Sequence, residues 1–384
     1  MDISLYFNPI DFELFEQAGK FHKNSLGYQV RKDTLKYLEA RKGGIRVAIF
    51  GVPHETDPVN KGTSKAPDQI RKHLYRLSNL EGFRGIVDLG NLKKGKTGQD
   101  IQFALRDVVE FLSDNGITAV ILGGSQDISI GVARAFRDVK DFTLTVVDSV
   151  VNVKTGIQAT RSSNFISRIL NENPELFHLQ MIGIQSHLVS PATLEMLREQ
   201  TFDYIHLGPL RDEFKDVEPK LRNTHFLSFD ISSVRQSDAR TGFQLSSSGL
   251  YGEEACRISH YAGLSNKIRV FGLFEVNPDK DSGEVTLDLS AQIIWYFLEA
   301  LSHRSLADPV HDQDAFNRYF TELEGHTIVF YKHLSTGRWW IDISNPGKES
   351  WLIPCREKDY LLAMKEEIPD VWWKFARKTD KFSK

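Results

Sequence analysis

Acidic side chains stand directly after several short apolar runs of this 384-residue chain, and they are the first candidates for chemistry. The clearest case is Asp148, which follows a run from Phe142 to Val147 in which every residue is apolar or threonine. Such a run predicts a strand buried on both faces of a parallel sheet. Ligands of open α/β sheets bind beyond the carboxyl ends of the strands, so Asp148 is a site candidate. For a single acid, a helix cap is the alternative.

Three further acids, Asp127, Asp230 and Glu275, also follow apolar runs. Parallel strands end at one edge of a sheet, so these carboxylates are expected to approach Asp148. Glu275 has an alternative role, which is to pair with a neighbouring arginine. His187 follows the apolar run 181–184 and could supply an imidazole to the same edge, although a single loop histidine is more often only solvated.

The elements that must position these residues are short strands alternating with amphipathic helices. This alternation predicts an α/β fold in which a parallel sheet is covered on both faces and connected by right-handed crossovers. The eight predicted strands lie near residues 45–52, 86–89, 117–122, 144–147, 181–184, 204–207, 226–229 and 268–274.

Composition narrows the function classes. With 41% hydrophobic and 26% charged residues, the chain can bury a large core. Its formal net charge of -3 argues against a dedicated nucleic-acid binder. Cys256 and Cys355 form neither a disulfide framework nor a thiolate zinc cluster, which favours a cytoplasmic location. No apolar run reaches about 18 residues, so no membrane span is expected.

Three domains are expected: a helical N-terminal extension (1–44), the α/β domain (45–307) and a C-terminal extension (308–384). The sequence of the C-terminal extension predicts a β-hairpin around residues 333–337, then helices near 357–367 and after Pro369. It holds five of the six tryptophans, which are Trp339, Trp340, Trp351, Trp372 and Trp373. Tryptophan is enriched at binding hot spots, so a protein partner is one role for the extension. The alternative is that these rings attach it to the α/β domain.

Several strand ends carry an ordered series of motifs. They are Gly51-Val52-Pro53, Gly123-Gly124-Ser125-Gln126-Asp127, Asp148-Ser149-Val150-Val151-Asn152, Ser228-Phe229-Asp230-Ile231-Ser232, Gly249-Leu250 and Glu275-Val276-Asn277-Pro278. As a set, from about residue 45 to 301, the series resembles the ureohydrolase superfamily of arginase, agmatinase and formimidoylglutamase. The resemblance implies a three-layer arginase-like fold with an eight-stranded, mostly parallel sheet, and a homo-oligomer, which is common among relatives.

The resemblance also implies a reaction, in which hydroxide held between two manganese ions attacks a guanidinium or formimino carbon. Asp148 and Asp230 match the two bridging acids, and Glu275 matches the acid beside the substrate. Four other ligand positions depart from the family pattern. Gln126 and Val150 stand in place of histidines, and Asn152 and Ser232 stand in place of acids.

These departures predict a degenerate metal site and no bound cofactor. Two acids that face each other without a cation repel, so at least one should have a raised pKa. The sequence therefore favours a pseudoenzyme that binds a protein partner or acts as a scaffold. The alternative is a hydrolase of linear amidines, of the formimidoylglutamase or agmatinase type, with one Mg, Ca or Mn ion and a small guanidino or formimino ligand.

Overall fold

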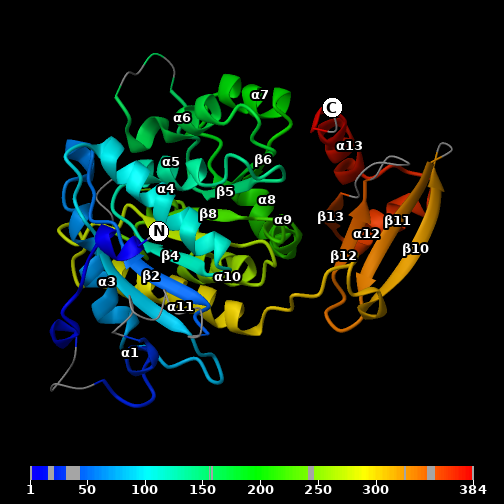
Figure 1. Cartoon of the computed structure of the whole chain (residues 1–384). Helices are drawn as coiled ribbons and strands as arrows, with labels where there is room; N and C mark the ends of the chain where they lie inside the picture. Colours follow the sequence, from blue (N-terminus) through cyan, green and yellow to red (C-terminus); the bar gives the residue numbers. More distant parts are fainter. Residues whose placement is uncertain are drawn as a thin grey trace.

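The apolar, β-branched runs of the sequence form strands in the computed structural model of the chain. The structure describes residues 2–15, 21–31, 44–154, 156, 159–240, 246–323, 326–343 and 351–382. In this part of the chain a large sheet carries helices on both faces, and a smaller antiparallel sheet lies to one side of it (Figure 1). The predicted α/β fold is confirmed.

All eight predicted strands are present, and each pairs with its neighbours in parallel. A two-residue strand, β1 (Phe7–Asn8), pairs antiparallel with β3 and makes this a nine-stranded sheet in the order β1-β3-β2-β4-β9-β8-β5-β6-β7. The parallel strands are β2 (Val47–Gly51), β3 (Ile86–Leu92), β4 (Thr118–Leu122), β5 (Thr143–Val147), β6 (His178–Ile184), β7 (Asp203–His206), β8 (Phe226–Asp230) and β9 (Val270–Phe274).

Two helical layers cover the sheet. One face carries α3 (Ala66–Leu74), α10 (Gly252–Gly263) and α11 (Val285–His303), and the other carries α4 (Gly98–Asp114), α5 (Ser129–Arg134) and α6 (Phe165–Glu172) (Figure 1). Each layer buries its apolar side chains in a separate cluster against the strands. The predicted three-layer arrangement is therefore present. Shorter helices, α7 (Pro191–Glu199), α8 (Leu207–Asp212) and α9 (Val217–Leu221), follow β6 and β7.

The N-terminal extension is only partly helical where it is described. It contains the 3-10 turns η1 (Ile3–Tyr6) and η2 (Phe12–Leu14), the strand β1 and the single-turn helix α1 (Leu26–Gln29). The later part of this predicted helical extension, residues 32–43, lies outside the described residues. Strand β1 was not predicted, because two residues show no periodicity.

The C-terminal extension forms its own four-stranded antiparallel sheet in the order β10-β11-β12-β13. Its strands are β10 (Phe316–Leu323), β11 (His326–His333), β12 (Trp339–Asp342) and β13 (Leu352–Cys355), and two helices follow, α12 (Glu357–Ala363) and α13 (Asp370–Phe382). The predicted hairpin is β11–β12, with Val329 opposite Asp342. Both predicted helices are also present, whereas β10 and β13 were missed.

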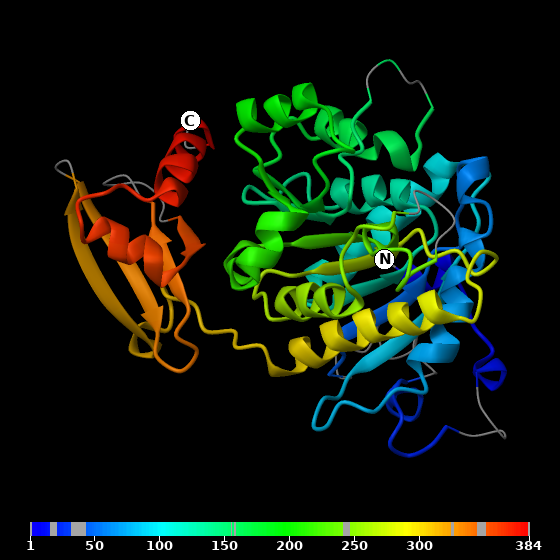
Figure 2. The same cartoon turned by 180° about the vertical axis from the view of Figure 1, so that it is seen from behind.

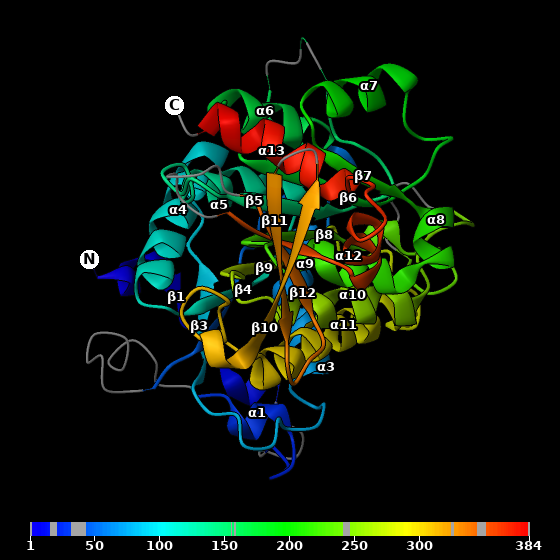
Figure 3. The same ribbon diagram turned by 90° about the vertical axis from the view of Figure 1, so that its right-hand side faces the viewer.

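The C-terminal extension lies beside the amino ends of the parallel strands (Figures 2 and 3). Arg222, which precedes β8, donates to the carbonyl oxygens of Trp339 at 2.6 Å and Cys355 at 3.4 Å. Trp351 stacks on Phe177, with ring centroids 4.8 Å apart. Trp340 and Trp351 therefore pack on the α/β domain, while Trp373 is 46% exposed. None of the helices in the described ranges is long and apolar enough to span a bilayer.

Candidate functional site

The sheet register brings three of the predicted acids to one edge. Val147 of β5 lies opposite Phe229 of β8, so Asp148 and Asp230 follow paired residues on adjacent strands. Asp230 in turn lies opposite Phe274 of β9, and Glu275 is the next residue. All three carboxyl groups are buried. The register therefore places these three acids at the same edge of the sheet.

Asp148 uses both of its carboxylate oxygens within the loop that follows β5. The backbone N–H of Val150 donates to Oδ1 at 3.1 Å, and the side-chain amide of Asn152 donates to Oδ2 at 2.6 Å. Burial, followed by the charge of Asp230, raises the pKa of Asp148 well above its usual range. Burial therefore favours the protonated form of this carboxyl group.

Asp230 ends β8 and begins the 3-10 turn η8 (Ile231–Ser233). Its Oδ1 accepts the backbone N–H of Ser232 at 2.7 Å, which is the usual bond of a capping aspartate. Burial raises the pKa of Asp230 to about 6. The raised pKa values of Asp148 and Asp230 agree with the expectation for two acids that share a site without a cation.

Glu275 is held by three donors on a single oxygen. Its Oε1 accepts the backbone N–H of Gln126 at 2.7 Å, the hydroxyl of Ser162 at 2.6 Å and the amide of Asn60 at 3.2 Å. The residue also has a φ of 63°, a conformation that is strained for a residue other than glycine. Burial, followed by the charge of Asp230, raises the pKa of Glu275 to about 8. Strain and desolvation thus coincide at this carboxyl group, as they do at many functional sites.

Asp127 lies in the 3-10 turn η5 (Gln126–Ile128) and faces the loop after β2. The hydroxyl of Thr56 donates to its Oδ1 at 2.7 Å, and His54 Nε2 lies 3.6 Å from its Oδ2. A Cβ atom at Gly124 would come within 1.9 Å of the His54 carbonyl oxygen. Only glycine allows this approach, which explains the Gly-Gly pair before Asp127.

Several buried oxygen atoms around the acids have no hydrogen-bond partner among the described residues. They include Gln126 Oε1, Ser232 Oγ and Glu275 Oε2. The amide nitrogen of Gln126, in contrast, donates to Ser228 Oγ at 3.1 Å. Oxygen atoms of this kind suit a hard cation such as Mg²⁺ or Ca²⁺, so these are the atoms that could hold one.

Two of the predicted residues, Val150 and His187, add no side-chain group to this cluster. Val150 contributes only its backbone N–H, and its side chain has no atom that can bind a metal. His187 is exposed in the turn after β6. Ser162 and Asn60, which hold Glu275, were not predicted. Ser162 lies in a loop without a distinctive pattern, whereas Asn60 follows Gly51-Val52-Pro53 in the motif series that resembles the family.

Comparison with known proteins agrees with this geometry. The model of the "Arginase family" matches residues 45–299. The formimidoylglutamase of Staphylococcus haemolyticus is 23% identical over 246 residues, which is 62% of this chain and 79% of the relative. The formimidoylglutamase of Salmonella schwarzengrund is 26% identical and covers 61% of this chain and 77% of its own length.

Solved structures show the same fold. The formimidoylglutamase of Bacillus subtilis superposes with a TM-score of 0.64 at 19% identity, covering 75% of this chain and 96% of its own. A Trypanosoma cruzi formiminoglutamase variant, solved with Mn²⁺, gives a TM-score of 0.63 at 19% identity, covering 70% of this chain and 98% of its own. The matched range 45–299 contains all eight parallel strands and the three buried acids. The chain belongs to the arginase family.

Proposed function

We propose that this protein is an arginase-family pseudoenzyme that has kept the fold and the buried acids but binds or scaffolds instead of hydrolysing. One contact carries the proposal: the amide of Asn152 donates to Asp148 Oδ2 at 2.6 Å. In the family pattern the position of Asn152 holds a second acid that binds the metal with Asp148, and here it holds a neutral amide that donates a hydrogen bond to Asp148 instead. Asn152 stands where the family pattern has an acid, so the substitution also changes a ligand into a donor.

The other substitutions at the family's metal-ligand positions also weaken the site for manganese. A metal-bound hydroxide requires ligands that hold the metals and lower the pKa of the bound water. Val150 offers no ligand atom, and Gln126 and Ser232 offer only neutral oxygens. The residues present therefore do not fit a two-manganese centre, and we derive no hydrolytic step through one.

A second candidate function follows from the unpartnered oxygens. Gln126 Oε1, Ser232 Oγ and Glu275 Oε2 are buried close to two further carboxyl groups, a set that suits one hard cation. In this alternative the protein is a hydrolase of linear amidines, similar to the formimidoylglutamases it matches, with a single ion. Glu275 would then bind the cationic guanidino or formimino group of the substrate.

Metal analysis and turnover assays separate the two candidates. The purified protein is assayed with formimidoylglutamate, agmatine and arginine in the presence of Mn²⁺ or Mg²⁺, and its metal content is measured after dialysis. The pseudoenzyme predicts no release of formamide, urea or ammonia and no stoichiometric metal. Metal-dependent turnover that is lost in Asp148→Ala would establish the alternative instead. As a matched gain experiment, Asn152→Asp combined with Val150→His, Gln126→His and Ser232→Asp should increase Mn²⁺ affinity.

A binding role requires an interaction surface, and we place it on the outer side of the C-terminal extension. Leu361 of α12 and Met364 just after it lie three residues apart, and they are 52% and 56% exposed. Trp340 and Trp351 are not available for this role, because they pack on the α/β domain. The partner is another protein or a second copy of this chain. Light scattering of the pure protein distinguishes these, and unchanged association in Leu361→Ser with Met364→Ser would exclude this surface.

A further inference from the structure

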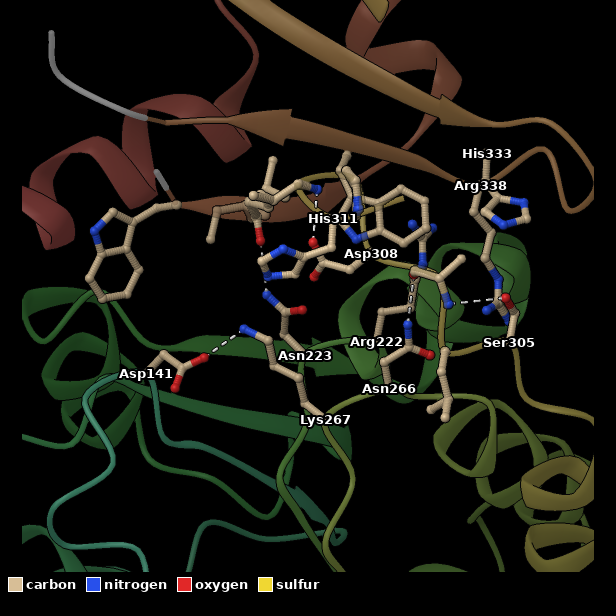
Figure 4. Close-up of a pocket in the computed structure, with 18 of the residues that line it drawn as sticks. Asp141, Arg222, Asn223, Asn266, Lys267, Ser305, Asp308, His311, His333 and Arg338 are labelled. Carbon is tan, nitrogen blue, oxygen red and sulfur yellow. Dashed lines mark hydrogen bonds and ion pairs between the residues drawn. The ribbon is translucent and has the colours of Figure 1, made fainter. Parts of the chain in front are cut away.

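The four-stranded sheet of the C-terminal extension has one covered edge and one open edge. At the covered edge, β13 lies against α9 of the α/β domain. Arg222 donates to the carbonyl oxygen of Cys355 at 3.4 Å, and Asn223 donates to that of Leu352 at 3.3 Å. Figure 4 shows Arg222 and Asn223 beside a cavity of about 670 Å³, the amino-edge cavity. Other residues that line it are Asp141, Lys267 and Arg338. Because β13 is covered, this edge is closed to a further strand.

The open edge is strand β10, which pairs with β11 on one side and with no described strand on the other. It lies on the side of the extension away from the large sheet (Figure 1) and faces the viewer in Figure 3. Within the described ranges, no group outside β11 forms a hydrogen bond with the backbone of residues 317–322. The outward N–H and C=O groups of β10 are therefore available to another strand.

Strand β10 lacks the features that usually protect an open edge from pairing. Its eight residues keep an unbroken register with β11, so no bulge turns the edge away. It contains neither proline nor lysine. Its two charged residues, Arg318 and Glu322, have opposite signs, so the strand has no net charge that would repel a second copy.

The side chains of β10 alternate between the two faces of the small sheet. Tyr319 lies on the face that α12 covers, where its ring centroid is 5.1 Å from those of Trp339 and Tyr360. Arg318 lies on the opposite face, with its guanidinium 5.5 Å from the ring centroid of Tyr331, its direct neighbour on β11. Because side chains alternate along a strand, Phe320 and Glu322 share the face of Arg318.

These three side chains are exposed, and Phe320 is exposed by 63%. Among the described residues, neither Arg318 nor Glu322 has an ion-pair partner. The open edge therefore presents a cation, an aromatic ring and an anion at intervals of two residues.

This spacing makes β10 complementary to a second copy of itself. When a two-fold axis relates two antiparallel strands, the numbers of opposed residues have a constant sum, and opposed side chains share a face. With Phe320 on the axis, the two rings are opposed, and each Arg318 is opposite Glu322 of the other copy. An axis at Arg318 or Glu322 would oppose like charges, and an axis at Tyr319 or Thr321 would oppose Phe320 to a charge.

We propose that the protein forms a two-fold dimer through β10, in which the two four-stranded sheets join into one antiparallel sheet. Two Arg318–Glu322 ion pairs flank the contact between the Phe320 rings. Because β13 is covered in both copies, the joined sheet has no open edge and assembly ends at the dimer. Strand β10 lies outside residues 45–299, which the family model matches. The inference goes beyond the proposed function and does not depend on whether the carboxyl-edge site is active.

Sedimentation velocity of the full chain at micromolar concentrations tests the proposal by charge reversal. The unmodified protein should sediment as a dimer. Arg318→Glu opposes two acids at each end of the contact, and Glu322→Arg opposes two arginines there. Each variant alone should raise the dissociation constant of the dimer about tenfold or more, because an attraction becomes a repulsion at two symmetric places.

A mixture of the two reversal variants supplies a rescue. In a heterodimer of Arg318→Glu with Glu322→Arg, every opposed pair again has opposite charges, so the mixture should associate as the unmodified protein does. The double variant, with both changes in one chain, should also form a dimer. Misfolding cannot produce either gain. Arg198→Glu is the matched control, since Arg198 forms an exposed ion pair with Glu195 on α7, and it should leave the dimer unchanged.

Cross-linking locates the two-fold axis. Phe320→Cys places a thiol on the axis, so a short bis-maleimide should join two chains through this position. Leu334→Cys is the comparison, because Leu334 is also exposed in the extension, by 58%, but lies away from β10. The natural thiols of Cys256 and Cys355 are buried and should not react.

Three outcomes would overturn the proposal. They are a monomeric unmodified protein, association that neither charge reversal weakens, and two reversal variants that fail to associate with each other. Association that is lost in Leu361→Ser with Met364→Ser but kept in both reversal variants would also contradict it, because the contact would then involve α12.

Discussion

The two edges of the large sheet differ in the charged side chains that they carry. At the carboxyl edge, Asp148, Asp230 and Glu275 are buried together and favour a proton or a cation. At the amino edge, lysines and arginines form ion pairs with carboxylates, and the C-terminal extension lies over them. The family fold supplies the first edge, and an addition outside the matched range supplies the second. The two edges are therefore built by different parts of the chain.

The difference also gives the edges opposite pH dependences. The acids at the carboxyl edge have pKa values above their ordinary range, so the folded protein binds protons there that the unfolded chain releases. At the amino edge, burial and then the charge of Lys378 lower the pKa of His178 to about 3, so the unfolded chain binds the extra proton. Rising pH therefore destabilises the first edge, and falling pH destabilises the second.

The largest expected effect on stability comes from removing the contacts that Arg222 makes at the amino edge. This side chain is 5% exposed and joins Glu218 to two carbonyl oxygens of the extension. Arg222→Met leaves these buried acceptors without their donor and should lower the free energy of unfolding by about 3–5 kcal/mol. Urea unfolding measures the loss, and limited proteolysis should show earlier cleavage in the extension.

Arg198→Met is the control for this experiment, because the exposed Arg198–Glu195 pair should contribute less than about 1 kcal/mol. If the two variants were equally stable, the contacts of Arg222 would not hold the extension to the α/β domain.

The next effect tests the carboxyl edge at Glu275. Its pKa is raised from 4.5 to about 8, so the free energy of unfolding should fall as pH rises through this window, with the loss complete above about pH 8. Glu275→Gln keeps the acceptor oxygen and removes the charge. It should be more stable than the unmodified protein by about 2–5 kcal/mol near pH 9 in EDTA.

Chemical unfolding across pH measures this difference. Identical pH profiles for the two proteins would show that Glu275 holds no proton of its own. If Mg²⁺ or Mn²⁺ stabilised only the unmodified protein, a cation would replace the proton, as in the single-ion alternative.

A smaller effect of opposite sign belongs to His178. The amine of Lys378 donates to its Nδ1 at 2.5 Å, and its Nε2 lies 3.4 Å from Asp203. The folded pKa is below the ordinary 6.5, so the contribution of the neutral ring is complete above about pH 6.5 and is lost as pH falls toward 3. Between about pH 6.5 and pH 4.5 the loss should reach about 2–3 kcal/mol.

His178→Gln should remove this acid sensitivity, measured as the shift of the urea midpoint with pH. His187→Gln provides the comparison, because His187 is an exposed loop histidine. Retention of the full acid sensitivity in His178→Gln would assign it to other groups.

The strands were predictable because each has a local cause in the sequence. A run such as 142–147 is apolar and β-branched, and a strand with this composition must be buried on both faces. Strand β13 was missed because it is short and contains Pro354, which a strand tolerates only at an edge, and β13 is indeed an edge strand. Its pairing with β12 depends on the rest of the extension, so a local pattern does not reveal it.

The candidate site also has residues that the sequence predicts and residues that it does not. Asp148, Asp230 and Glu275 were predictable because parallel strands place their ends at one edge. Ser162, which holds Glu275, lies 113 residues before it in a loop, and no periodicity determines the path of that loop. The amino-edge cavity has no sequence motif, because Asp141, Lys267 and Arg338 come from three distant segments that only the docked extension brings together.

The smallest expected effect concerns Trp351, which helps to hold the extension on the α/β domain. Trp351 stacks on Phe177 at a centroid distance of 4.8 Å and an interplanar angle of 20°. Trp351→Leu keeps an apolar side chain but loses the stack, and it should cost about 0.5–1.5 kcal/mol. Trp373→Leu, at a ring that is 46% exposed, should change the free energy of unfolding much less. Thermal unfolding measures both. Because Trp351 lies at the amino edge, its loss should leave the pH profile set by Glu275 unchanged, and a shift in that profile would show that the two edges are coupled through the sheet.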